Sequence, residues 1–287
     1  MTSNIPRVSV LMSVYNGEPY LSDSIESVLH QSFTDFEFII IDDGSTDSSL
    51  EIIRNYSQID KRIRYFHQKN IGLTPSLNRG IMKAQAEYLA RMDDDDVALP
   101  GRLESQVKFL DKNRDVVAVG GQVLLIDQHG QLLTDYDGYP VSDEKGQMEG
   151  IYQTHNEIDR ALLSGRWPLV QSACLFRLSS VKAVKGYDER YRTNQDHDLF
   201  LKLAEIGELH NLTQAVIKYR RHSGQVTNKT SGRDFENILL LKRIRREAYK
   251  RRGMSIPQNL QITELIKTDL KSRLSNSSIW PYLQKTR

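Results

Sequence analysis

The sequence predicts an α/β fold in which helices flank a mainly parallel sheet, followed by a helical C-terminal extension. Short runs of β-branched and other apolar residues alternate with stretches whose apolar residues recur at helical spacing. This alternation is typical of strands joined by crossover helices. Turns rich in Asp, Asn and Gly follow several of the runs. The 287 residues are enough for one large domain or two small ones with a sizeable core.

Strand and helix units make up the first part of the chain. The expected strands are 8–15, 36–41, 63–66 and 88–92, and the expected helices lie around 21–29, 50–56 and 73–86. Because parallel strands with right-handed crossovers end at the same edge of a sheet, the turns that follow them should lie close together. Asp42 and Asp43 follow the second strand, and Asp93–Asp96 follow the fourth. We therefore expect these carboxylates at the edge where open α/β sheets bind ligands.

The second part of the chain is less regular. We expect a helix over 102–112, a strand over 116–126, a loop-rich insertion over 127–160, further regular structure over 166–223 and helix from residue 231 onward. The predicted organisation is one domain over residues 1–230, divided near residue 125 into 1–125 and 126–230, with a helical extension over 231–287. No internal repeat or low-complexity segment interrupts it.

Composition and charge exclude several classes of protein. The 39 basic and 37 acidic residues give a net charge of +2, so no global field favours nucleic acid and we expect no nucleic-acid partner. The single cysteine, Cys174, excludes an internal disulfide and a thiolate zinc cluster, and its apolar neighbours indicate a core thiol. The N-terminus does not resemble a signal peptide, and no apolar run reaches the roughly 20 residues of a membrane span. We expect a cytoplasmic protein.

The four adjacent carboxylates Asp93–Asp96 repel one another, and partial burial at the end of a strand would raise their pKa values. A solvated loop is the simple explanation. A divalent cation held by one or two carboxylates and by substrate phosphates is the alternative that the position favours, because the metal relieves the repulsion. Asp47, in the turn after the second strand, is expected to cap a helix.

Several motifs in a fixed order resemble the family 2 glycosyltransferases with the GT-A fold. They are Ser9–Asn16, Asp42–Asp47, Asn70-x-Gly72, Leu77–Gly80, Ala90–Asp96, Val184–Asp188, Gln195–Leu199 and Tyr219–His222. The resemblance covers about residues 7–223. It implies that residues 1–125 bind a nucleotide sugar and that residues 126–230 carry the acceptor side and the catalytic base.

The resemblance also implies roles for single residues. Donor-binding roles fall on Ser13, Tyr15, Asp43, Asp93 and Asp94, metal-ligand roles on Asp95 and His222, and the role of catalytic base on Asp196. Tyr15 would stack on the base, and Asp43 would accept hydrogen bonds from base or ribose. Gln195 departs from the family pattern, because it stands where a Glu is commoner. Asp198, Asn78 and Arg79 are interpreted as structural.

The activity implied is the inverting transfer of a sugar from a nucleoside diphosphate sugar, with UDP favoured, to an acceptor hydroxyl. Mn²⁺ or Mg²⁺ would stabilise the leaving diphosphate, and one carboxylate would take the acceptor proton. The implied acceptor is a sugar or a lipid-linked sugar of a bacterial surface polysaccharide or glycoconjugate. The basic run Lys242–Arg252 is either a solvated helix face or a peripheral contact with anionic lipid.

Two other functions stay open at this point. Asp93-x-Asp95 after an apolar strand also resembles the nucleophile loop of haloacid-dehalogenase-like phosphatases, although three strand units precede it here. Gln195 would suit a non-catalytic nucleotide-sugar-binding protein. Trp167-Pro168 could belong to the core or to the wall of an acceptor site.

Overall fold

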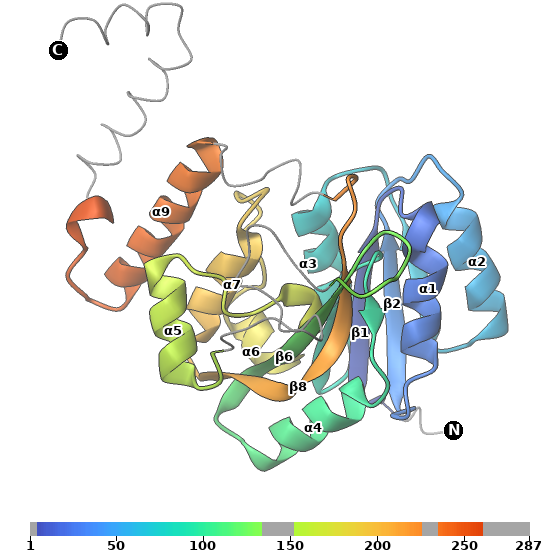
Figure 1. Ribbon diagram of the computed structural model, residues 1–287, viewed down its shortest axis with the longest axis horizontal. Coiled ribbons are helices and arrows are strands. Elements are labelled where there is room, and N and C mark those ends of the chain that lie inside the picture. Colours follow the sequence, from blue (N-terminus) through green and yellow to red (C-terminus); the bar gives the residue numbers. More distant parts are fainter. Residues whose placement is uncertain (1–4, 134–151, 226–234, 261–287) are drawn as a thin grey trace, which may run out of the picture.

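The computed structural model describes residues 5–133, 152–225 and 235–260, which form a mixed sheet covered by helices on both faces (Figure 1). The strands are β1 (Val8–Val14), β2 (Phe36–Asp42), β3 (Ile63–His67), β4 (Tyr88–Met92), β5 (Val97–Ala98), β6 (Val116–Ile126), β7 (Leu175–Arg177) and β8 (Glu208–Arg220). The helices are α1 (Glu18–Leu29), α2 (Ser49–Ile59), α3 (Leu73–Lys83), α4 (Arg102–Lys112), α5 (His155–Ser164), α6 (Leu178–Ala183), α7 (Gln195–Leu203) and α9 (Phe235–Arg251). Short 3₁₀ turns cover η1 (Gln171–Ala173) and η2 (Gln258–Leu260).

The sheet has the strand order β3-β2-β1-β4-β7-β6-β8-β5. Strands β1 to β4 are parallel, β7 is antiparallel to both of its neighbours, and β6 and β8 are again parallel. Val14 lies opposite Asp42, and Met12 lies opposite Met92. The turns after β1, β2 and β4 therefore meet at one edge of the sheet, as predicted.

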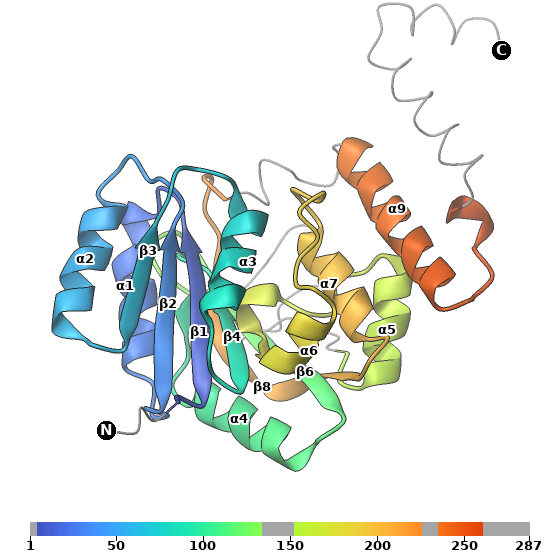
Figure 2. The ribbon, with the colours of Figure 1, turned by 180° about the vertical axis from the view of Figure 1, so that it is seen from behind.

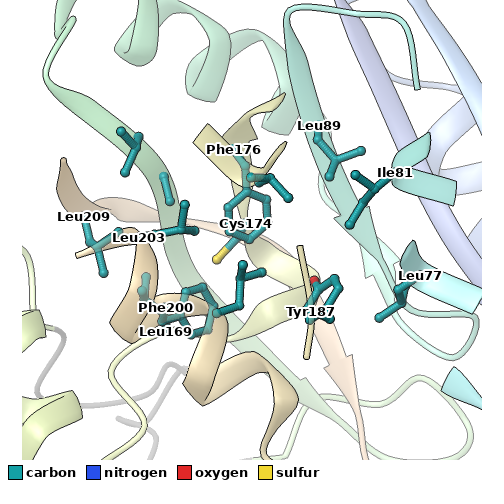
Figure 3. Packing of buried hydrophobic residues seen from close by; sticks show 14 of the residues in the cluster. Leu77, Ile81, Leu89, Leu169, Cys174, Phe176, Tyr187, Phe200, Leu203 and Leu209 are labelled. Carbon is teal, nitrogen blue, oxygen red and sulfur yellow. The ribbon is translucent and has the colours of Figure 1, made fainter. Parts of the chain in front are cut away.

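Two hydrophobic layers hold the helices to the sheet, because alternate residues of a strand face opposite sides. On β1, Val10 and Met12 pack into the layer under α1, α2 and α4, whereas Leu11 packs into the layer under α3, α6 and α7. Figure 2 shows the second face, and Figure 3 shows its packing around Cys174 and Phe176. Burial raises the pKa of the Cys174 thiol, so this residue is an inert part of the core.

The predicted α/β fold class is confirmed, and the bounds of α4 and β6 are those predicted. The expectation of a loop-rich insertion is wrong for its last part, because α5 begins at His155. A capping box, in which Thr154 and Glu157 bond reciprocally, starts this helix. The expected helix around 73–86 ends at Lys83. Residues 134–151 of the expected insertion and 261–287 of the expected extension lie outside the described residues.

Helix α9 packs against α5 and α7, and its buried Ile244 and Ala248 join the core. Much of its basic run is used within the chain. Arg245 Nε donates to the carbonyl of Leu163 at 2.8 Å. Arg251 pairs with Glu205 at 2.8 Å, and Arg252 pairs with Asp159 at 2.7 Å. Among the described residues, no helix is long and apolar enough to span a membrane.

Candidate active site

The turn after β1 presents Tyr15 to solvent beside the turn after β2. Tyr15 is 52% exposed, whereas Ser13 is buried within the strand. Asn16 has a left-handed backbone, with φ of 57°, and its Oδ1 accepts a 2.8 Å hydrogen bond from the backbone N–H of Thr46. The Asp47 carboxylate accepts the backbone N–H groups of Glu18 and Ser49, at 3.1 and 3.0 Å. Gly17 and Ser48 are the N-cap residues of α1 and α2, but Asp47 accepts the first backbone N–H of each helix, as a capping side chain does, and so fixes the two turns against each other.

Asp43 lies just beyond the end of β2 and is almost fully buried. Its Oδ1 accepts hydrogen bonds from Gln68 Nε2 at 2.7 Å and from the Ile71 backbone at 2.9 Å. Its Oδ2 accepts the backbone N–H of Gly72 at 2.8 Å. In the structure Asp43 thus shapes the 68–72 turn, and its predicted contact with a nucleotide stays a prediction.

The acidic turn after β4 brings carboxylates close to one another and to the end of β8. Ligand oxygens of Asp93, Asp95 and Asp96 lie within 4.8 Å of one another. Nε2 of His222 lies 3.0 Å from Oδ2 of Asp95, although 127 positions separate the two residues. The ring of Tyr20 packs against His222, with centroids 4.6 Å apart. The structure thereby juxtaposes the two residues to which the resemblance gave metal-ligand roles.

The carboxylates of this turn have different surroundings. Asp96 is fully buried, and its two oxygens accept from Ser172 Oγ and, at 3.0 Å, from the Arg220 backbone N–H. Asp94 lies against the start of α1, because a Cβ placed on Gly17 would be 2.4 Å from Asp94 Oδ2. The positive end of that helix favours a carboxylate there. Asp96 is therefore structural, and Asp93 and Asp95 are the carboxylates left for a cation.

Buried arginines lie beneath the acidic turn. Arg91 is 1% exposed and pairs with Asp93. Arg102 is equally enclosed and donates through Nη2 to the Arg91 carbonyl at 2.7 Å. Arg220 donates through Nε to the Asp95 carbonyl at 2.9 Å. These guanidinium groups offset part of the negative charge and hold the backbone of the turn.

The remaining negative charge fits a divalent cation. Burial, followed by the charges of neighbouring carboxylates, raises the pKa values of Asp94 and Asp96 well above their usual range. Burial also raises the pKa of Asp93. A donor set of carboxylate oxygens and one imidazole suits Mn²⁺ or Mg²⁺. The residues present thus fit the predicted metal.

Asp196 stands in the first turn of α7, after Asn194, whose φ is 59°. Burial raises the pKa of Asp196 to about 6, and the negative charge of Asp93 also acts to raise it. Oδ1 of Asp196 accepts the His197 backbone N–H at 2.9 Å. Gln195 is buried, and in the described part of the chain its Oε1 has no hydrogen-bond partner.

Trp167 packs against the start of α7. Its ring meets that of His197 edge to face, with centroids 4.9 Å apart, and 43% of the residue is exposed. Trp167 is therefore a surface residue beside the candidate base, whereas the next two residues, Pro168 and Leu169, are buried.

Sequence reasoning missed the buried support of the site, namely Arg91, Arg102 and Ser172. Arg91 carried a readable signal, since it is the one charged residue in the otherwise apolar strand Tyr88–Met92. Nothing local marks Ser172, because its partner Asp96 is 76 positions away.

Comparison with known proteins identifies the family that the sequence motifs resemble. The family described as Glycosyl transferase family 2 matches residues 9–163. An uncharacterized glycosyltransferase of Haemophilus influenzae is 31% identical, over 84% of this chain and 73% of its own length. The putative glycosyltransferase EpsE of Bacillus subtilis is 33% identical, over 82% of this chain and 81% of its own length.

Solved structures with low sequence identity share the fold. S. aureus TarS 1–349 in complex with UDP-GlcNAc is 16% identical, with a TM-score of 0.65 over 98% of this chain and 76% of that one. The mannosyltransferase PcManGT of Pyrobaculum calidifontis, in complex with GDP-Man and Mn²⁺, is 15% identical, with a TM-score of 0.57 over 99% of this chain and 80% of that one. The GT-A-like fold is thus confirmed, and the chain belongs to glycosyl transferase family 2.

Proposed function

We propose that the protein is a metal-dependent, inverting glycosyltransferase that moves a sugar from a UDP-linked donor to an acceptor hydroxyl. One observation carries the proposal: Asp93, Asp95 and His222, which come from two separate parts of the sequence, converge at the ligand-binding edge of the sheet. Membership of the family removes the phosphatase alternative.

The donor occupies the turns after β1, β2 and β4. Exposed Tyr15 offers a ring on which the base stacks, and Ser13, Asp43 and Asp94 lie in the turns or strand ends around it. The complexes of TarS with UDP-GlcNAc and of PcManGT with GDP-Man support a nucleotide sugar as donor. UDP is the favoured nucleotide.

Asp95 and His222, with Asp93 beside them, would hold Mn²⁺ or Mg²⁺. A metal held there would supply the positive charge that stabilises the leaving diphosphate. The complex of PcManGT with GDP-Man and Mn²⁺ supports this assignment. The buried arginines keep the acidic turn in place before the metal binds.

Asp196 takes the proton from the acceptor hydroxyl. The hydroxyl oxygen then forms a bond to the anomeric carbon as the bond from that carbon to the diphosphate oxygen breaks, which inverts the anomeric configuration. A pKa of about 6 leaves the carboxylate ionised at neutral pH yet more basic than an ordinary aspartate. We place the acceptor sugar, free or lipid-linked, in bacterial surface polysaccharide or glycoconjugate synthesis.

A peripheral membrane contact would serve a lipid-linked acceptor. Within the described ranges, Lys242 and Arg243 form no ion pair, and Arg245, which also forms none, is bonded to the Leu163 carbonyl, so we infer that Lys242 and Arg243 face anionic lipid. Lys242→Gln with Arg243→Gln should weaken sedimentation with anionic vesicles, whereas neutral vesicles serve as the control.

The test of the proposed function measures release of UDP from a panel of UDP sugars, with p-nitrophenyl glycosides as acceptors and with added Mn²⁺. Asp196→Asn should slow release at least about 100-fold while UDP affinity stays within about twofold, because the base acts only in the chemical step. Asp188→Asn, in an ion pair with Arg190, is the matched control and should keep activity. Unchanged release in Asp196→Asn would contradict the role of Asp196. A protein that binds UDP but releases UDP from none of the tested UDP sugars would favour the non-catalytic binding protein.

A further inference from the structure

The surface next to the candidate base carries a large aromatic side chain. The ring of Trp167 is fixed on one side by His197, 4.9 Å away. Nε2 of His197 lies 3.0 Å from the Leu162 carbonyl, and burial lowers the pKa of His197 to about 4, so this imidazole is a neutral support. Almost half of Trp167 nevertheless remains exposed. A held, half-exposed indole ring next to a sugar-transfer site offers a face on which a pyranose ring can pack.

The backbone ties Trp167 to the acidic turn. Ser172, five positions further along the chain, donates its hydroxyl to Asp96. Five residues span at most about 18 Å even when fully extended. On the other side, His197 directly follows Asp196 in α7. A sugar packed on Trp167 therefore lies within the length of an oligosaccharide acceptor from both the base and the donor turns.

Positive charge gathers at the turn before Trp167. Arg166 is exposed and donates through Nη1 to the hydroxyl of Tyr152 at 3.0 Å. The guanidinium group of Arg245 lies against Gly165, where an added Cβ would be 2.9 Å from Nη1. Neither arginine forms an ion pair with a residue in the described parts of the chain. Arg245 also stabilises the end of α5, yet the hydrogen bond found there uses only its Nε.

The charge at this turn is opposite to that of the donor turns. A neutral sugar needs only the aromatic face, whereas two arginines without carboxylate partners suit an oxyanion, to which guanidinium groups donate in pairs. We propose that Trp167, Arg166 and Arg245 form an acceptor subsite for a sugar ring that bears a phosphate or a carboxylate group. This assignment rests on the proposed function, since it gives the acceptor of that reaction its chemical class.

The chain contains two tryptophans, so Trp280→Phe leaves Trp167 as the single indole fluorophore. In this variant, with UDP and Mn²⁺ present, we would titrate N-acetylglucosamine, its 1-phosphate and glucuronic acid and follow the emission. The proposal expects at least one charged sugar to change the emission with an affinity at least tenfold above that of the neutral sugar. Comparison of the sugar 1-phosphate with glucuronic acid identifies whether the subsite binds a phosphate or a carboxylate group. No change with any of the three, or equal affinities, would overturn the proposal.

Variants separate the aromatic from the charged part. Arg166→Gln should remove most of the preference for the charged sugar, while Arg160→Gln, on the neighbouring helix α5, should keep it. Trp167→Ala should raise the acceptor KM at least tenfold without changing the KM for the donor. Trp167→Phe, which keeps an aromatic ring, should have an acceptor KM close to that of the parent. Equal effects on both KM values would mean a structural role only. Absence of UDP binding in the parent protein, measured separately, would instead count against the proposed function.

Discussion

At the residue scale, Asp196 is a carboxylate whose surroundings resist its ionisation. Burial raises its pKa to about 6, so below that pH most of the protein carries a protonated base. We expect kcat/KM to rise with pH through about 6 and to level off above it. Initial rates of UDP release from pH 5 to pH 8 measure this profile, with melting curves to confirm that the protein stays folded. A flat profile down to pH 5 would contradict the assignment.

The same pKa shift affects stability. Because the folded state raises the pKa of Asp196, its stabilising effect is complete below the unfolded value near 4 and is lost as the pH rises through about 6. At pH 8 the ionised, mostly enclosed carboxylate therefore costs stability. Asp196→Asn removes this cost and should raise the free energy of unfolding by about 1–3 kcal/mol at pH 8, although the variant loses activity.

Urea unfolding of Asp196→Asn and the parent protein at two pH values measures that difference. The two proteins should be nearly equal in stability at pH 4. A variant that is less stable at pH 8 than the parent would show that Asp196 is there to support the fold.

Part of the site could be read from the sequence because its residues follow strands. Asp93, Asp95, Asp43 and Tyr15 come directly after apolar runs, and parallel connections bring such positions together. The support beneath them could not be read in this way. The bond of Ser172 to Asp96, and the two bonds of Asp43 to backbone groups of the 68–72 turn, depend on register between distant segments.

At the scale of elements, the turn after β2 depends on Gly44. Its φ is 76°, and an added Cβ would lie 2.6 Å from the backbone nitrogen of Asn70. Gly101 has a similar φ of 75° but open space around it. Gly101→Ala should therefore cost about 1–2 kcal/mol of strain. Gly44→Ala should cost at least about 1 kcal/mol more, because the backbone of the 68–72 turn must move.

Chemical denaturation of both glycine variants measures this difference, and UDP titration shows its consequence. Gly44→Ala should weaken UDP binding because Asp43 shares the displaced turn, while Gly101→Ala should bind normally. Equal stability and equal affinity in the two variants would show that the turns do not contact each other as described.

Elements with a clear apolar pattern in the sequence, whether helical periodicity or a continuous buried run, were predictable, and those defined by tertiary pairing were not. Helix α4 and strand β6 agree with the sequence pattern residue for residue. Strand β5 has two residues and exists because it pairs with β8. Strand β8 has an irregular pattern of burial, with register shifts against β6, so it lacks the alternation by which a strand is recognised. The capping box before α5 was readable, but it lay in a polar stretch that favoured a loop.

At the scale of the molecule, a single sheet joins both halves of the site. Strands β1, β2 and β4 carry the donor turns, and β8 leads directly to His222, beside Asp95. Helix α9 packs against α7 and α5, and Arg251 pairs with Glu205 just after α7 while Arg252 pairs with Asp159 of α5. The negative charge of Asp93–Asp96 is thus offset in part by buried arginines and, as we propose, by a metal ion that also binds the donor diphosphate. The proposed division of residues 1–230 into donor and acceptor parts stays a prediction.

The most direct test of the proposed site is calorimetric titration of UDP into the parent protein, Asp95→Ala and His222→Ala, each with Mn²⁺ and with EDTA. Asp188→Asn is the control. We predict that the parent and the control bind UDP at least tenfold more tightly with Mn²⁺, and that both site variants lose this dependence. Binding by the parent that is equally tight in EDTA, or a dependence on Mn²⁺ that survives in both site variants, would contradict the assignment of Asp95 and His222.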